Sequence, residues 1–253
     1  MRFTIEAACG CNRGKIRSNN EDNFFFDGKC LESENDGLKH PVSFECDLRG
    51  RIMMAVFDGM GGENYGEIAS FSAARKMQSI EKKFADFFIS DKKYLKRLTA
   101  ELNEAVLGAS RELLTSQMGT TMVSLSFGSR SVYVCNVGDS RAYCLRDGAF
   151  MQISTDHTDV RPGREGKKAP LTQHLGIPED VMVIEPYIAR GELKHGDKYL
   201  ICSDGLTDML TNLEIATVMI ENEDTEKCVE ELIANALDRG GRDNVTAIVV
   251  KIS

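Results

Sequence analysis

Three aspartates stand where apolar segments meet turns, and their positions suggest a common chemistry. Asp58 follows the run MMAVF, Asp204 follows YLICS, and Asp243 comes just before NVTAIVV. A carboxylate beside a buried strand is costly unless it is paired or bound to a cation. No Lys or Arg neighbours Asp58 or Asp204 in the sequence. Singly, each aspartate is more typical of a turn or a helix cap, whereas three in this pattern favour a shared cation site.

The residues around these aspartates indicate which cation would bind. If the strands converge, their acids form an all-oxygen pocket, which Mg²⁺ or Mn²⁺ prefers and zinc does not. Gly59 has no side chain, so its carbonyl can approach an ion as a further ligand. Glu21 and Asp22 add two acids, and Arg17 stands shortly before them. Because a guanidinium fork matches two phosphate oxygens, the pattern predicts a metal site that binds phosphate.

These residues need strands to bring them together, and alternating or continuous apolar runs predict such strands. The run 120–128 alternates and predicts a strand with one core face, which two following segments continue as an antiparallel meander. Asp147-Gly148 suits a two-residue hairpin turn. The polar stretch 28–50 is expected to be a surface excursion with one short strand. The strands are expected at 3–10, 22–28, 51–58, 120–128, 131–138, 141–155, 181–186, 197–204 and 244–252.

Apolar residues at steps of three and four predict helices over 67–84 and 94–114, and a helical segment is expected over 225–237. Hairpins and clustered helices without regular strand–helix alternation predict an α+β layered fold.

Composition and charge bound the class of protein. The 253 residues are 42% hydrophobic and 28% charged, with no repeat or linker, which favours one domain over 1–253. A net charge of -8 argues against a nucleic-acid binder. No bilayer-spanning run or signal peptide is present, so a cytoplasmic protein without a membrane partner is expected. The eight cysteines are scattered and are expected to be buried free thiols.

Seven motifs together resemble one enzyme family. The set is R-x-x-N-E-D, VFDGMGG, MGTT, NVGDSRAY, STDH, CSDGLTD and GGRDNVTAIVV. It is similar to the metal-dependent serine/threonine protein phosphatases, the PPM or type 2C family, in their bacterial form. The motifs occur in family order from about residue 10 to residue 250. The resemblance implies a four-layer α-β-β-α sandwich, in which helix pairs flank two antiparallel sheets and a two-metal site lies in a cleft at one end.

The resemblance also implies the metal ligands. Asp58 resembles the carboxylate that bridges both metals, and Gly59 resembles the carbonyl ligand of one of them. Asp204 and Asp243 resemble the remaining direct ligands of the other metal.

Other residues take roles beside the metals. Glu21 and Asp22 match acids that hold coordinated water, and Arg17 matches the phosphate-binding arginine. Asp139 and Asp208 match acids that hold a third, weaker metal in related enzymes.

The activity implied is hydrolysis of phosphoserine and phosphothreonine in proteins by hydroxide formed between two Mn²⁺ or Mg²⁺ ions. The substrates would be those of a serine/threonine kinase, and the enzyme would act as a monomer. One alternative is a catalytically weak, phosphatase-like binding module, although all three ligand acids are present. Another is a phosphatase dedicated to one regulatory protein, which the site residues cannot distinguish from the first.

Some residues near the motifs remain open from sequence alone. His157 is more typical of a buried, hydrogen-bonded turn than of catalysis. Asn244 fits a structural turn role at least as well as metal chemistry. The segment 158–175 carries basic residues that either attract an anionic phosphopeptide or form a solvated loop. These are Arg161, Arg164, Lys167 and Lys168.

Overall fold

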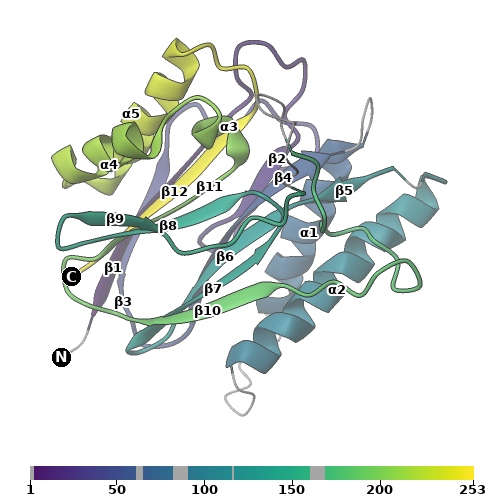
Figure 1. Cartoon of the computed structure of the whole chain (residues 1–253), viewed down its shortest axis with the longest axis horizontal. Coiled ribbons are helices and arrows are strands. Elements are labelled where there is room, and N and C mark those ends of the chain that lie inside the picture. Colours follow the sequence, from purple (N-terminus) through teal and green to yellow (C-terminus); the bar gives the residue numbers. More distant parts are fainter. Residues whose placement is uncertain (1–2, 61–64, 82–90, 116, 160–168) are drawn as a thin grey trace.

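The computed structural model describes residues 3–60, 65–81, 91–115, 117–159 and 169–253. Two antiparallel sheets stack face to face, and helices cover the outer face of each (Figure 1). The α+β four-layer sandwich expected from the sequence is confirmed.

The first sheet joins the two ends of the chain. Its strand order is β3-β1-β12-β11-β8-β9, and every residue of β12 pairs with β1. Its strands are β1 (Thr4–Asn12), β3 (Val42–Asp47), β8 (Arg141–Arg146), β9 (Ala149–Gln152), β11 (Lys198–Cys202) and β12 (Val245–Ile252).

The second sheet has the order β10-β7-β6-β4-β2, and the short β5 pairs with β4 off this path. Its strands are β2 (Asp22–Phe25), β4 (Ile52–Met60), β5 (Gly119–Thr120), β6 (Met122–Phe127), β7 (Ser131–Val137) and β10 (Tyr187–Glu192).

Three apolar layers hold the sandwich together. One lies between the sheets, a second lies between the β2–β10 sheet and the first helix pair, and a third lies between the other sheet and the last helices. The helices are α1 (Gly66–Glu81), α2 (Asp91–Glu112), α3 (Asp204–Thr207), α4 (Asn212–Glu221) and α5 (Thr225–Asp238). No helix within the described ranges is both long and apolar enough to cross a bilayer.

Most of the expected elements are present. The hairpin turn is confirmed, because Asp147 and Gly148 both adopt positive φ, at 52° and 78°. The stretch 28–50 contains one strand, β3, and is otherwise irregular. The last residues of the helix expected over 67–84 lie outside the described part of the chain.

Three expectations about strands are wrong. The meander is interrupted, because β7 and β8 lie in different sheets and the chain crosses between them at 138–140. The strand expected at 181–186 instead forms directly after Pro186, as β10. All six residues of β6 are buried. The sequence predicts one core face for this strand, but helices α1 and α2 cover its other face.

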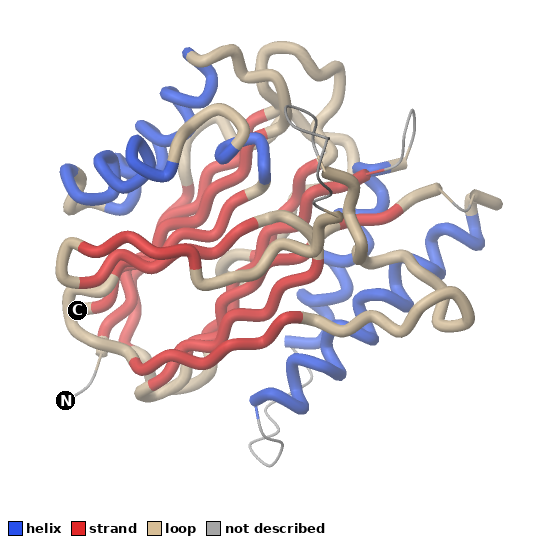
Figure 2. Tube along the Cα trace, in the orientation of Figure 1, coloured by secondary structure: helices blue, strands red, loops and turns tan. Residues whose placement is uncertain are grey.

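The ends of β2, β4, β11 and β12 that carry the predicted site meet at one end of the sandwich. Asp22 pairs with Asp58 across β2 and β4, and the backbone of Ser203 donates to the carbonyl of Thr246. Loops join the strands at this end (Figure 2). The predicted acids therefore belong to one region of the molecule.

Packing of α2 against its sheet should be a main source of stability. Leu102 is fully buried there, whereas Leu213 on α4 is 77% exposed. We expect Leu102→Ala to lower the free energy of unfolding by about 2–5 kcal/mol, because it removes buried atoms and leaves a cavity. Leu213→Ala, the same change on another helix, should stay within about 0.5 kcal/mol. Chemical denaturation of both variants measures this, and equal losses would contradict the packing described.

Candidate metal centre

A cavity of about 390 Å³ lies at this end of the sandwich. Five carboxylates line it, and one guanidinium is the only basic group among its described lining residues. The lining residues are Arg17, Glu21, Asp58, Gly59, Met60, Thr121, Asp139, Ala169, Pro170, Leu171, Asp204 and Asp243. Seven of the nine residues singled out from the sequence are thus brought together, and Asp22 and Asp208 are not among those lining the cavity.

Asp22 lies beside the cavity, buried between the two sheets with 1% of its surface exposed. Its Oδ2 accepts hydrogen bonds from Ser203 Oγ and Thr246 Oγ1, both at 2.7 Å. Asp22 and Asp58 are directly paired residues on neighbouring strands, so their side chains share one face of the sheet. Asp22 therefore links the strand carrying Asp58 to the segments that carry the other two aspartates.

The other oxygen of Asp22 has an unusual environment. Its Oδ1 is buried and has no hydrogen-bond partner within the described residues. Burial raises the pKa of Asp22 to about 7, although hydrogen bonds from Thr246 and Ser203 oppose this shift. A buried polar atom without a partner is rare in folded proteins and calls for a water molecule or an ion.

The backbone of Asp58 is fixed by the MGTT motif. Thr121 Oγ1 accepts from the Asp58 N–H at 3.1 Å, and the Thr121 N–H donates to the Asp58 carbonyl at 2.8 Å. Thr120 Oγ1 donates to the same carbonyl at 2.9 Å. Thr121 Oγ1 also pairs with Ser140 Oγ at 2.6 Å, which connects this strand end to the loop carrying Asp139. These contacts give the two threonines a positioning role.

Glycine is required at position 59 by the protein's own backbone. A Cβ there would lie 2.2 Å from the Gly66 carbonyl oxygen and 2.5 Å from that of Glu21. The Gly59 N–H also donates to the Glu21 carbonyl at 3.0 Å. Close approach is thus the reason for this glycine, and the approaching groups in the structure are backbone carbonyls.

Glycine at position 205 has the same cause. A Cβ at Gly205 would lie 1.9 Å from the carbonyl oxygen of Asn244. Gly205 follows Asp204 and Asn244 follows Asp243, so this contact sets how closely the two aspartate-bearing segments pack.

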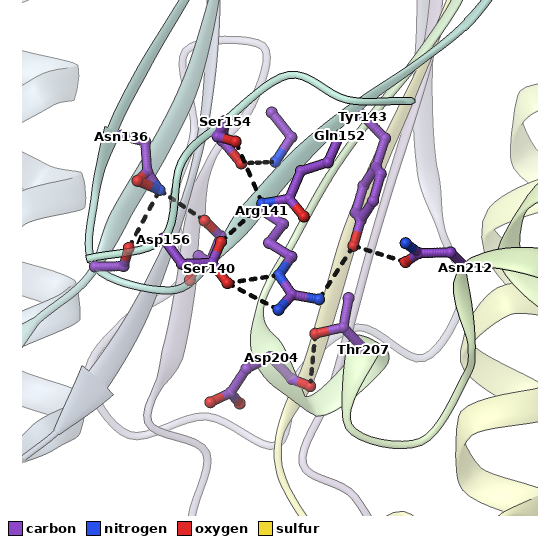
Figure 3. Close-up of polar contacts among 12 residues, drawn as sticks. Asn136, Ser140, Arg141, Tyr143, Gln152, Ser154, Asp156, Asp204, Thr207 and Asn212 are labelled. Carbon is purple, nitrogen blue, oxygen red and sulfur yellow. Dashed lines mark hydrogen bonds and ion pairs between the residues drawn. The ribbon is translucent and has the colours of Figure 1, made fainter. Parts of the chain in front are cut away.

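Asp204 begins the short helix α3 and is 6% exposed. Its carbonyl accepts from Thr207 Oγ1 at 3.3 Å and from the Asp208 N–H at 2.7 Å, which closes the helical turn. Figure 3 shows the carboxylate of Asp204 on the side away from Thr207. Asp208 ends the turn and is exposed.

A chain of polar contacts runs from β8 to the start of α4, close to Asp204 (Figure 3). Arg141 donates to Asp156 Oδ2 from Nε and Nη2, at 2.9 and 2.8 Å. Arg141 Nη1 also donates to the hydroxyl of Tyr143, which in turn donates to Asn212 Oδ1 at 3.2 Å. This chain ties β8 and the loop after β9 to the start of α4.

Asp243 and Arg17 form an ion pair at the edge of the cavity, with 2.6 Å between Arg17 Nη2 and Asp243 Oδ2. The hydrogen bond to Asp243 raises the pKa of Arg17 above its usual value. Glu21 lines the same cavity, and its pKa is raised, chiefly by burial. An anion entering the cavity would meet Arg17 beside these acids.

The donor set fits a hard divalent cation. Carboxylates dominate the lining, and Asp22 Oδ1 lacks a partner within the described residues. Oxygen donors of this kind suit Mg²⁺ or Mn²⁺. As they stand, however, the described residues contain no group of three or more His, Cys, Asp or Glu side chains that could hold a metal ion. The carboxylates surround the cavity without closing on a single point.

His157 supports the loop that carries Asp139. Its ring Nδ1 accepts from the Gly138 N–H at 3.1 Å, and the backbone N–H of His157 donates to the Gly138 carbonyl at 2.9 Å. Burial lowers the pKa of His157 below its ordinary value. These contacts match the hydrogen-bonded turn role expected from the sequence, but His157 is partly exposed and not buried as expected.

Sequence reasoning did not identify Ser203, Thr246 or Gly205 as site residues. Ser203 and Thr246 bear hydroxyls in or next to apolar strands, where they resemble ordinary strand residues until the other sheet is placed. Of the segment 158–175, residues 169–171 contribute to the cavity wall. The basic residues of that segment, Arg161, Arg164, Lys167 and Lys168, lie outside the described residues.

The glycine contact gives a direct test of the packing. We expect Gly205→Ala to lower the midpoint of thermal unfolding, because the added methyl group must displace the Asn244 backbone. Gly50→Ala should have little effect, since nothing lies within 4 Å of a Cβ at that exposed position. Differential scanning fluorimetry compares the two. A Gly205→Ala variant as stable as Gly50→Ala would show that the two segments are not in contact.

His157 should make stability depend on pH. Its pKa in the folded protein lies below that in the unfolded chain, about 6.5, so the folded state binds fewer protons in this window. The stability it contributes is present above that value and is lost as the pH falls through the folded-state pKa. We expect unfolding midpoints to fall more between about pH 7 and 5 in the parent than in His157→Asn, which keeps an acceptor for Gly138. Identical pH profiles would contradict this.

Known proteins are similar in sequence to most or all of this chain. A sequence model described as protein phosphatase 2C matches residues 42–242. The serine/threonine phosphatase stp of Listeria innocua is 30% identical over 255 positions, covering 95% of this chain and 93% of the relative. The serine/threonine protein phosphatase PstP of Mycobacterium tuberculosis is 28% identical, and the match covers 100% of this chain and 46% of that protein.

Solved structures share the whole fold. The catalytic domain of PstP in complex with two manganese ions superposes with a TM-score of 0.75 at 26% identity, covering 99% of each chain. The serine/threonine phosphatase of S. agalactiae gives a TM-score of 0.79 at 25% identity, covering 98% of this chain and 99% of the other. With a family match over most of its length and this shared fold, the chain belongs to the protein phosphatase 2C family.

Proposed function

We propose that this protein is a metal-dependent phosphatase that hydrolyses phosphoserine and phosphothreonine in proteins. The observation that carries the proposal is one cavity lined by carboxylates from five separate segments and by the guanidinium of Arg17, the one basic group among the described lining residues. Phosphoryl transfer needs charge neutralisation and positioning more than covalent chemistry from the protein. A cavity with this charge pattern can supply both once cations are bound.

The metal ligands are proposed as follows. Asp58 would bridge two cations, the carbonyl of Gly59 would complete the shell of one, and Asp204 and Asp243 would hold the other. Because these groups do not close on one point, water ligands and small side-chain rotations would complete the coordination, and Mg²⁺ commonly keeps several waters. When bound, such a cation pair lowers the pKa of a water molecule so that hydroxide is available at neutral pH.

The chain's own residues would bind and orient the phosphate. Arg17 can direct its fork at two phosphate oxygens, and it now pairs with Asp243 at the cavity edge. Glu21 and Asp22 Oδ1, which has no hydrogen-bond partner in the part of the chain that the structure describes, would accept hydrogen bonds from water held near the cations. Met60 also lines the cavity and cannot donate a proton to the leaving group.

A third, weaker cation is proposed at Asp139 and Asp208. Asp139 lines the cavity and Asp208 lies one helical turn after Asp204, so both could approach an ion near the rim.

Further proposals concern the setting of the enzyme. Residues 1–253 would form one phosphatase domain, which the pairing of β1 with β12 supports. The enzyme would act as a monomer on substrates of a serine/threonine kinase. All eight cysteines are free thiols, as expected, and six are buried. Free thiols suit the reducing cytoplasm, where we place the protein.

Hydrolysis of a small aryl phosphate with and without Mn²⁺ tests the proposal. We expect turnover by the parent to require the metal. Asp204→Asn should lower kcat at least about a hundredfold, because the loss of one preorganised charge at the reacting centre has an effect of that size. Asp180→Asn, the same change at an exposed turn, should behave like the parent.

Two results would count against the function. Turnover that persists without divalent metal would exclude the mechanism, and so would an Asp204→Asn variant as active as Asp180→Asn. If metal binding is retained without turnover on any phosphorylated protein, a binding module is the better description.

A further inference from the structure

Arg17 lies in a loop that has no regular structure of its own. Residues 13–20 form neither helix nor strand, and the side chain of Arg17 is 44% exposed. A long, exposed arginine loses considerable rotamer entropy when it is held in one place. A phosphate clamp at this position therefore depends on whatever fixes the loop.

The side chain of Asn244 makes three hydrogen bonds to this loop. Its Oδ1 accepts from the Glu21 N–H at 2.8 Å. Its Nδ2 donates to the carbonyl of Arg13 at 2.8 Å and to that of Asn19 at 2.9 Å. Both amide protons are thus used, and Asn244 is only 3% exposed.

The three contacts flank Arg17 on both sides, so one amide group spans the base of the loop. Asp243, the residue before Asn244, also contacts the loop. The carboxylate of Asp243 accepts a hydrogen bond from the guanidinium of Arg17. A Cβ on Gly14 would lie 2.3 Å from the carbonyl oxygen of Asp243, so the backbones of the two segments are in close contact. The Asp243-Asn244 pair therefore holds the base of the loop and the tip of Arg17 together.

The contacts of Asn244 fit neither a local turn nor a metal ligand, the two roles that the sequence leaves open. A simple turn residue bonds to its own neighbourhood, whereas the partners of Asn244 lie 223 to 231 positions away in the chain. Asp243 is among the residues that line the cavity. The side chain of Asn244 is bonded to the loop, and Asn244 is not among the residues that line the cavity.

We infer that Asn244 is a positioning residue for phosphate binding, which acts by holding the 13–21 loop so that Arg17 faces the cavity. The inference rests on the proposed function, because it concerns the phosphate that the enzyme would hydrolyse. Removing the amide leaves the Glu21 N–H and the carbonyls of Arg13 and Asn19 without these partners, so the loop loses its fixed conformation.

A double-mutant cycle separates this role from general support of the fold. The four proteins are the parent, Arg17→Ala, Asn244→Ala and the double variant. Inorganic phosphate serves as a competitive inhibitor of aryl phosphate hydrolysis at saturating Mn²⁺. We expect Asn244→Ala to weaken phosphate inhibition about tenfold and the double variant to be no weaker than Arg17→Ala alone, because residues that act through one another are not additive.

Two controls accompany the cycle. Asn103 is a second buried asparagine that ties a loop, since it bonds to the backbone of Gly176 and Ile177. Asn103→Ala should lower the unfolding midpoint and leave phosphate inhibition unchanged. Calorimetric titration should show that Asn244→Ala still binds Mn²⁺ like the parent. If Asn244→Ala does not fold, Asn244→Ser replaces it in the cycle, since a hydroxyl cannot reach all three partners.

Different results would contradict the positioning role of Asn244 and the proposed function. If the parent hydrolyses the substrate, but the effects of Asn244→Ala and Arg17→Ala multiply or Asn244→Ala leaves phosphate inhibition unchanged, the positioning role is wrong and the function stands. A parent without metal-dependent hydrolysis would instead overturn the function itself.

Discussion

The hydrogen bonds that Asp22 accepts from Ser203 and Thr246 connect the two sheets at the end where the cavity lies. A carboxylate buried between sheets is costly, and two hydroxyl donors offset only part of that cost, as the raised pKa of Asp22 indicates. These hydrogen bonds align β2 with the end of β11 and the start of β12. Since Asp58 pairs with Asp22 across β2 and β4, the same contact places Asp58 near Asp204 and Asp243.

Backbone packing completes what this contact begins. Gly59 lets the chain near Glu21 and Gly66 approach the end of β4, and Gly205 lets α3 rest on the carbonyl of Asn244. A side chain at either position would push apart segments that carry the acids. Polar side chains fix the neighbouring segments. Thr121 is bonded to Asp58 at the end of β4, and Asn244 is bonded to the 13–21 loop. The site is therefore a property of the sandwich end as a whole.

Much of this arrangement was predictable from the sequence. Carboxylates at the ends of apolar runs, together with the motif order, indicated the acids that line the cavity. The sequence could not reveal that β8 leaves the sheet of β7, because a short polar turn looks alike whether the chain pairs back or crosses over. Likewise, the apolar run in 181–186 resembles a strand, although hydrogen bonding to β7 begins only after Pro186.

The supporting residues were harder to predict for a physical reason. Ser203 and Thr246 act through a carboxylate on the opposite sheet, at a separation of 181 and 224 positions. From the sequence, Gly59 suggests close approach of an ion, whereas in the structure the groups nearest to a Cβ there are carbonyls of the chain. Contacts of this kind depend on how the sheets stack, and local sequence carries little information about stacking.

Acids carried by both sheets should share one pair of cations, and anomalous scattering from crystals grown with Mn²⁺ tests this most directly. We expect two manganese peaks in the cavity about 3.5–4 Å apart, both bound by Asp58 and one of them also by Asp204 and Asp243. Manganese bound away from Asp58, or a single ion that leaves Asp204 and Asp243 without metal contacts, would contradict the proposed centre.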